Sequence, residues 1–312
     1  MDLKILTKEQ FLDYIPSLNR LFKKSFGKDI HPDFLKWRYL DNPTGELLVA
    51  VAIEDGEIIA NYSASPGFFR KGNESSKTAL SMTTMTDPNY NGMGLFPKLA
   101  NMLYNEMIER NYSAVWGFPN GNSHGAFVKK LGWKDIYEIP TLRYEVKKQE
   151  NKKMEKFYRI EFDNEYNKID AINLIKKDQY FVEKSKKYYE WRYNKHPFNT
   201  YKHIVLFKNC EIVGSVLYKI YNNSIDILEF NGIENKEDIN CILSFLHNLA
   251  IESDYNSISC WMSVFDHKHT VFEKFGFDVT VPITYFCLKQ FKGNFELDYN
   301  KYFIQMGDSD VY

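Results

Sequence analysis

The chain has 312 residues, a formal net charge of −1, 44% hydrophobic residues and 16% aromatic residues. This length predicts about two domains with well-packed cores. The small net charge gives no global field toward nucleic acid or an acidic membrane. No apolar run reaches the roughly 18–20 residues of a membrane-spanning helix, and Met1 to Ile5 do not resemble a signal peptide. We therefore expect a cytoplasmic protein without membrane insertion and without a nucleic-acid partner.

The first half of the chain predicts alternating helices and strands. The helices are expected at 8–26, 32–40, 94–110 and 122–131, and the strands at 4–6, 47–54, 57–70, 77–86, 114–118, 133–137 and 141–146. Asp55-Gly56 predicts a tight hairpin turn between two of the strands. Pro16 interrupts the first helical pattern, so we expect a kink or a break into two shorter helices there.

The second half repeats motifs of the first half in the same order. Trp37-Arg38-Tyr39 recurs as Trp191-Arg192-Tyr193, and Lys130-Leu131-Gly132-Trp133 recurs as Lys274-Phe275-Gly276-Phe277. Helices are expected at 188–193, 236–251 and 267–275, and strands at 203–207, 211–221, 224–230, 257–262, 277–281 and 284–289. Repetition of this kind predicts two copies of one fold, 1–148 and 149–312, joined by a lysine-rich link. The aromatic tail, 293–312, is expected to dock on the body of the protein.

The four cysteines all lie in the second half: Cys210, Cys241, Cys260 and Cys287. Their spacings match no metal-binding motif, and their neighbours are apolar. We therefore expect reduced thiols and no bound metal ion.

The stretch from Asp87 to Phe96 is the most informative motif. It stands between a predicted strand and a predicted helix and contains Gly92 and Gly94. Glycines at such a junction let main-chain N–H groups surround an anion, and the helix N-terminus adds partial positive charge. The stretch lacks the third glycine of a dinucleotide fingerprint and the Gly-Lys-Ser/Thr of a Walker loop. A plain strand-to-helix turn is the alternative interpretation.

This stretch resembles the pyrophosphate loop of the GNAT acyltransferases, which use acetyl-coenzyme A. The family pattern has Arg or Gln, then Gly, then Gly or Ala; the matching positions here are Asn91, Gly94 and Phe96. Only Gly94 keeps the commonest residue. Main-chain N–H groups do most of the binding in such loops, so the resemblance implies a cofactor site at these residues: Asn91, Gly92, Met93, Gly94, Leu95 and Phe96.

The resemblance extends to the flanking elements. It implies that the main chain of Met85, Thr86 and Asp87 contacts the pantetheine arm and polarises the thioester carbonyl. Asn120 and Ser123 match a turn that reaches the pantetheine, although turn and N-cap roles explain Asn120 and Asn122 equally well. The family often places a tyrosine acid where this chain has Val128.

The resemblance therefore implies an α/β fold with two tandem GNAT-like domains, each a twisted, mostly antiparallel mixed sheet flanked by helices. Acetyl-CoA is expected in the first domain only, because Asn231 to Asp238 offers one glycine and several acids. The implied reaction moves an acetyl group to a small-molecule amine. The two Trp-Arg-Tyr triplets and the Gly-Asp-Ser-Asp tail resemble bacterial acetyltransferases of surface-polysaccharide synthesis, which implies an amino-sugar acceptor.

Candidates for the general base are His124, Asp308 and Asp310. A capping role for His124 and a solvating role for the two tail acids are the alternatives. Two other functions stay open. One is a Fem-like aminoacyl transferase that uses charged tRNA, and the other is a non-catalytic CoA-binding or scaffold protein.

Overall fold

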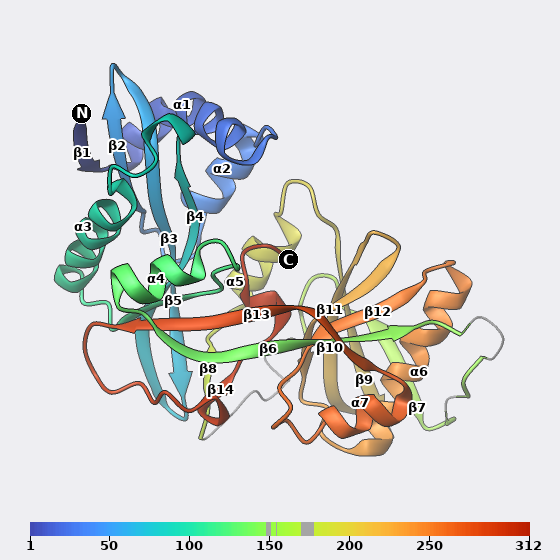
Figure 1. Ribbon diagram of the computed structural model, residues 1–312. Helices are drawn as coiled ribbons and strands as arrows, with labels where there is room; N and C mark the ends of the chain where they lie inside the picture. Colours follow the sequence, from blue (N-terminus) through green and yellow to red (C-terminus); the bar gives the residue numbers. More distant parts are fainter. Residues whose placement is uncertain (148–150, 154, 170–177) are drawn as a thin grey trace. The chain divides into compact units, whose positions relative to one another are not determined.

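The computed structural model describes residues 1–147, 151–153, 155–169 and 178–312. These residues form two compact units (Figure 1). Unit 1 comprises Met1–Tyr137, Lys195–Phe198 and Tyr285–Lys301, and unit 2 comprises Glu138–Asn194, Asn199–Thr284 and Tyr302–Tyr312. The predicted domain boundary, between 148 and 149, lies outside the described residues.

Unit 1 is a mixed sheet with helices on both faces. Its helices are α1 (Lys8–Phe26), α2 (Pro32–Tyr39), α3 (Leu95–Glu109) and α4 (His124–Leu131), with the short 3₁₀ turn η1 (Pro88–Tyr90). Its strands are β1 (Asp2–Ile5), β2 (Leu48–Glu54), β3 (Glu57–Lys71), β4 (Glu74–Thr86), β5 (Ala114–Gly117), the start of β6 (Lys134–Glu145) and the end of β13 (Asp278–Gln290). The sheet order is β1-β2-β3-β4-β5-β13. Only the β4–β5 pair is parallel, and α3 connects those two strands.

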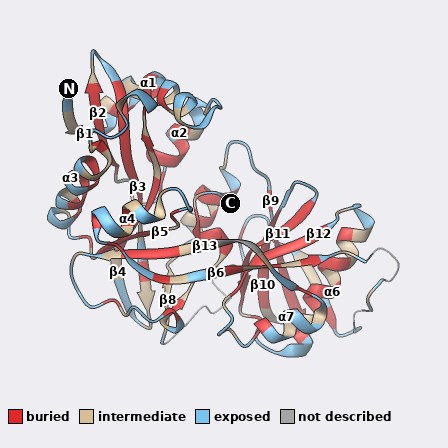
Figure 2. Ribbon diagram, in the orientation of Figure 1, coloured by how far each residue is buried: buried red, intermediate tan, exposed pale blue. Residues whose placement is uncertain are grey.

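The alternation of side chains along β2 explains the layers of unit 1. Leu48, Ala50 and Ala52 pack in one core with residues of α3, including Leu99 and Leu103. The intervening residues of β2 pack in a second core with α1 and α2. Successive residues of a strand point to opposite faces, so a strand buried along its length needs a helical layer on each side. Figures 1 and 2 show this arrangement, with α3 on one face and α1 and α2 on the other.

Strand β4 contains a bulge that changes its side-chain parity. Met82 and Met85 lie three residues apart, yet both pack in the core beneath α1. A regular strand cannot place them on one face, so an extra residue is inserted between them. The pairing of β4 with β3 shifts at this place, and Thr83 has a left-handed φ of 49°. The Asn61 amide donates a hydrogen bond of 2.7 Å to the Thr83 carbonyl and holds the bulge.

Unit 2 repeats the order of strands, helix, strand and helix. Its strands are the end of β6, β7 (Tyr158–Phe162), β8 (Tyr180–Val182), β9 (Tyr201–Lys208), β10 (Glu211–Tyr221), β11 (Ser224–Asn231), β12 (Ser257–Trp261), the start of β13 and β14 (Tyr302–Phe303). Its helices are α5 (Lys186–Tyr189), α6 (Lys236–Glu252) and α7 (His269–Phe275). A π-helical turn spans Glu190–Asn194, and the 3₁₀ turn η5 spans Met306–Asp308. A second 3₁₀ turn, η4 (Tyr299–Lys301), belongs to unit 1. The sheet order is β6-β12-β11-β10-β9-β7, and α6 packs over it.

Three sequence expectations about elements were wrong. Two closing strands were expected in each half of the chain, but β6 and β13 are each one continuous strand. Each of these strands passes from one unit into the other, so both units receive part of each. Of the two outcomes expected at Pro16, the break into two helices is wrong, since α1 runs unbroken from Lys8 to Phe26, and the kink stays a prediction. The sequence analysis also did not predict β7, β8 or β14.

Candidate functional site

The glycine turn of unit 1 has the backbone conformation that its sequence predicts. Gly92 has a φ of 84° and Gly94 a φ of 69°, both in the left-handed region. Asn91 is extended, and Gly94 is the N-cap of α3. A Cβ at either glycine would meet no atom within 4 Å, so the constraint there is the backbone angle rather than space.

The main-chain N–H groups of this turn are available to a ligand. Among the described residues, the N–H groups of Gly92 to Phe96 donate to no protein group, and no side chain caps α3. Pro97 follows and carries no N–H, so the free donors are concentrated in the turn itself. The turn is exposed as far as Met93, and the helix behind it has 15 residues. Unpaired donors at a positive helix end form an anion-binding site.

The strand that leads into the turn has an open side. Parallel pairing of β4 with β5 ends at Leu80 and Trp116, whereas β4 continues to Thr86. The Asp87 N–H donates to the Ile59 carbonyl on β3 at 2.8 Å. Because N–H directions alternate along a strand, the Thr86 N–H points away from β3, toward the side that β5 has left. A ligand lying along this side would meet main-chain donors and acceptors.

Asp87 places a carboxylate close to the proposed anion site, and the fold neutralises it. Its side chain accepts hydrogen bonds from Lys24 at 2.7 Å and from the Asn89 N–H at 3.0 Å. The Lys24 hydrogen bond, with help from Asn89 and against the effect of burial, lowers the pKa of Asp87. The carboxylate therefore serves as the cap of η1 and as an ion-pair partner.

Asn120 and Ser123 form a self-bonded turn at the start of α4. The Asn120 side-chain oxygen accepts from the N–H groups of Asn122 at 3.0 Å and Ser123 at 3.1 Å. The Ser123 hydroxyl in turn accepts from the Asn120 N–H at 3.1 Å. These contacts are those of the turn role, and within the described residues no side chain makes a capping hydrogen bond to α4. A pantetheine contact by the same residues stays a prediction.

His124 is held by its neighbours rather than free in solvent. Its Nε2 lies 2.6 Å from Asp135 Oδ1, and its ring stacks on Tyr285 with centroids 4.0 Å apart and planes at 6°. The carboxyl of Asp135 also accepts a hydrogen bond from the Cys287 thiol at 3.0 Å. A general-base role for His124 stays a prediction.

Asp308 belongs to a buried ionic cluster of unit 2. Lys184 Nζ lies 2.6 Å from Asp308 and 2.7 Å from Glu229, and all three side chains are at most 4% exposed. Glu229 also accepts from the hydroxyls of Tyr189 at 2.5 Å and Tyr193 at 2.6 Å. Burial raises the pKa of Asp308, although Lys184 opposes this effect. These contacts anchor the tail to unit 2, and the general-base role of Asp308 stays a prediction.

The remaining tail acid, Asp310, is partly exposed. Next to it, the Ser309 carbonyl accepts a hydrogen bond from the buried Arg192 at 3.2 Å. The second Trp-Arg-Tyr triplet therefore contacts the tail through its arginine and through the Tyr193 hydroxyl, which lies 3.5 Å from the Gly307 carbonyl.

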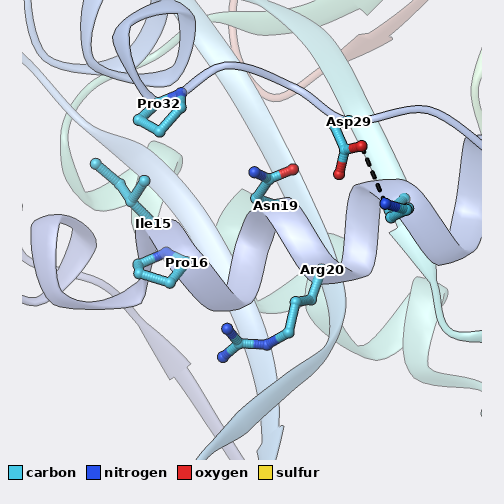
Figure 3. Close-up of a pocket in the computed structure, with 7 residues that line it drawn as sticks. Ile15, Pro16, Asn19, Arg20, Asp29 and Pro32 are labelled. Carbon is cyan, nitrogen blue, oxygen red and sulfur yellow. Dashed lines mark hydrogen bonds and ion pairs between the residues drawn. The ribbon is translucent and has the colours of Figure 1, made fainter.

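A shallow pocket lies along α1 (Figure 3). It is lined by Ile15, Pro16, Asn19, Arg20, Lys23, Asp29 and Pro32. Its charged groups are already paired, Lys23 with Asp29 at 3.0 Å and Arg20 with Glu57 at 2.6 Å. Helix α1 covers the face of the sheet opposite α3. This pocket is therefore separate from the glycine turn.

The corresponding junction of unit 2 has a different chemistry. Between β11 and α6, Glu234 pairs with Lys268 at 3.2 Å, and Asp238 in the first turn of α6 accepts from Lys208 at 2.9 Å and Tyr158 at 2.5 Å. Carboxylates at this helix end would repel a diphosphate. The expectation of a single coenzyme site stays a prediction.

The bulge residues Asn61 and Thr83 were not predicted from the sequence. The signal was present, because the apolar alternation of Leu80 and Met82 shifts parity at Met85. A shift of this kind in an otherwise regular strand indicates one inserted residue.

Comparison with known proteins supports the same assignment of the fold. Residues 5–136 match the family model described as an acetyltransferase (GNAT) domain. None of the curated proteins matches the sequence. Among the described residues, none of the helices is long and apolar enough to cross a membrane.

Solved structures resemble the chain over most of its length. A probable N-acyltransferase of Enterococcus faecalis V583 gives a TM-score of 0.71 at 11% identity, covering 93% of this chain and 72% of the other. A GCN5-related N-acetyltransferase of Anabaena variabilis gives 0.68 at 12%, covering 93% and 73%. One from Kribbella flavida gives 0.64 at 10%, covering 93% and 71%. The chain thus has a mixed α/β, GNAT-like fold, as its sequence predicts.

Proposed function

We propose that this protein is an acyl-CoA-dependent N-acyltransferase that moves the acetyl group of acetyl-CoA to a small-molecule amine. The observation that carries the proposal is the set of unpaired N–H groups at Gly92 to Phe96, at the N-terminus of α3. A diphosphate fits such donors in charge and geometry. The acetyltransferase domain match over residues 5–136 and the named structural neighbours support it.

The open side of β4 suggests how the thioester would be activated. With the diphosphate at the glycine turn, the pantetheine arm would run along β4, and the Thr86 N–H would donate to the thioester carbonyl oxygen. The amine nitrogen attacks the carbonyl carbon, the C–S bond breaks, and coenzyme A leaves as the thiol after taking up a proton. Proximity and a fixed donor for the oxyanion supply most of the acceleration.

An amino sugar of a surface-polysaccharide precursor is the acceptor that we propose. Support comes from the repeated Trp-Arg-Tyr triplets and the Gly-Asp-Ser-Asp tail. The two units are proposed to be tandem copies, since both place a helix between two parallel strands, α3 between β4 and β5 and α6 between β11 and β12. The acceptor is tested by measuring the release of free thiol with a panel of amino sugars, polyamines and amino acids.

A thermal-shift titration with acetyl-CoA tests the cofactor site. We expect wild type to be stabilised and Gly94→Glu to lose the stabilisation, because a carboxylate would occupy the anion site. Gly45→Glu is the matched control. Gly45 has a similar φ of 70°, and no atom lies within 4 Å of where its Cβ would be. It lies away from the glycine turn, because its neighbour Glu46 accepts a hydrogen bond from Tyr112, which follows the C-terminal end of α3.

The outcomes separate the candidate functions. A shift that persists in Gly94→Glu places the ligand elsewhere and overturns the proposed site. Binding without thiol release from any amine would favour a non-catalytic CoA-binding protein, to which Val128 in place of a tyrosine acid also points. Absence of binding together with turnover of charged tRNA would favour the Fem-like alternative.

A further inference from the structure

Three side chains of types that bind metal ions lie close together in unit 1, on α4, β6 and β13. They are His124, Asp135 and Cys287, whose ligand atoms all lie within 4.8 Å of one another. They come from three elements far apart in the sequence: the first residue of α4, the second residue of β6, and β13. Sequence spacing could not reveal this grouping, because metal motifs are recognised by short intervals.

The side chains are placed around one carboxylate oxygen. Asp135 Oδ1 lies 2.6 Å from His124 Nε2 and 3.0 Å from Cys287 Sγ. Four-coordinate zinc holds its ligands at ~2.0–2.3 Å, which sets them roughly 3.3–3.8 Å apart. The atoms therefore need to separate by only about 1 Å to admit an ion. The Asp135 side chain, 53% exposed, is free to make that movement.

The surroundings fix two ligands and leave a path for the ion. Cys287 is fully buried in the core of unit 1, and the His124 ring is fixed by stacking on Tyr285. His124 and Asp135 reach the surface, with side chains 24% and 53% exposed. A metal would thus enter from the solvent side, above the thiol. One imidazole nitrogen, one carboxylate oxygen and one thiolate are the donors that zinc uses in proteins.

We propose that His124, Asp135 and Cys287 form a zinc site with three protein ligands and a water molecule in the fourth position. On binding, the Cys287 S–H bond breaks, a Zn–S bond forms, and the proton passes to solvent. The carboxylate exchanges its hydrogen bonds for a bond to the ion. The site joins α4, which carries the Asn120–Ser123 turn at its start, to the strand that closes the sheet of unit 1.

Cobalt is the spectroscopic probe for this site, because a thiolate bound to Co²⁺ gives a charge-transfer band that oxygen and nitrogen ligands do not give. The full chain would be used with Cys210→Ser, which removes an exposed free thiol. We expect CoCl₂ to produce the band and ZnCl₂ to remove it by competition. Cys287→Ser should abolish the band. Cys260→Ser, a matched buried thiol in unit 2, should keep it.

A second readout needs no spectroscopic band. ZnCl₂ at about 100 times its Kd should raise the melting temperature by roughly 4 °C. Asp135→Asn, a surface change that leaves the core intact, should weaken zinc binding at least about tenfold. Absence of a cobalt band in the Cys210→Ser protein, or a band that survives in Cys287→Ser, overturns the proposal. Neither measurement involves acetyl-CoA, so failure here is distinct from failure of the proposed acyl transfer.

Discussion

Single residues of this protein show how burial decides the chemistry of a side chain. Asp226 on β11 faces Lys219 across the strand pair with β10, and both are only 6% exposed. Burial raises the pKa of Asp226 to about 6, while Lys219 and Arg143 act in the opposite direction. Burial also lowers the pKa of Lys219, despite the nearby carboxylate. Burial, followed by the charge of Asp226, raises the pKa of Tyr312, and Asp226 also contributes to the raised pKa of the buried Cys260 thiol.

Asp226 gives the protein a predictable dependence of stability on pH. Its folded-state pKa of about 6 lies above the unfolded value near 3.8, so the folded state binds this proton more tightly. The stabilisation is complete below about pH 4 and is lost as the pH rises through about 6. Urea unfolding should show wild type gaining about 2–3 kcal/mol relative to Asp226→Asn between pH 8 and pH 4. Asp278→Asn, which changes an exposed carboxylate, should show no comparable trend; equal trends in both variants would refute the assignment.

The residues of the candidate site were predictable where their role depends on the conformation of the main chain. Gly92 and Gly94 could be assigned because a left-handed φ requires glycine at a strand-to-helix junction. The grouping of His124 with Cys287 could not be predicted, since it depends on which strand returns beside β5. Asp308 was a candidate for the general base because it is one of two acids in the tail, and its contacts with Lys184 arise from packing that no local pattern records.

At the level of elements, helices and most strands were predictable, and the closing strands were not. Hydrophobic periodicity gave α1, α3 and α6 to within a residue or two. The expected gaps between the paired closing strands, 138–140 and 282–283, contain Pro140 and Pro282. Both lie inside continuous strands, β6 and β13, near the place where each strand changes unit. Where a strand passes from one unit to the other, its pairing partner changes. The backbone N–H that proline lacks is therefore less important for strand pairing at this place.

The bulge of β4 holds Thr83 in a strained backbone conformation, which leads to a prediction about stability. Thr83 is β-branched and has a φ of 49°, which costs roughly 1–2 kcal/mol for a residue other than glycine. Thr83→Gly should therefore be neutral or stabilising by up to ~1 kcal/mol, after the entropy cost of glycine. Thr84→Gly, one residue on and outside the left-handed region, should destabilise by about 0.5–1 kcal/mol. Denaturant unfolding measures both, and a larger loss in Thr83→Gly would contradict the strain.

The whole molecule is organised around segments that leave one unit and return to it. Cys287 to Gln290 of β13 pair antiparallel with β5 and so complete the sheet of unit 1. Lys195–Phe198 also belongs to unit 1, where His196 lies 4.4 Å from the Trp37 ring. The acetyltransferase match over residues 5–136 thus covers only the first of three segments.

This organisation predicts that the fragment 1–148 does not fold on its own. Without 285–301, β5 would be an unpaired edge, and Cys287 would be missing from the core that contains Val115 and Trp133. We expect no cooperative thermal transition by circular dichroism and no response to acetyl-CoA. Joining 285–301 to the fragment through a flexible linker should restore cooperative melting. A fragment 1–148 that melts cooperatively without the added strand would contradict the prediction.

The late position of β13 in the sequence also determines when the sheet of unit 1 can be completed during synthesis. The ribosome delivers Gly117, the end of β5, long before Gln290, the end of β13. At about 5–20 residues per second, the interval is roughly 10–35 s. Throughout that time the nascent chain carries an incomplete sheet whose free edge invites association with other polypeptides. Chaperone capture of the growing chain, and sensitivity of the yield to translation speed, follow from the position of one late strand.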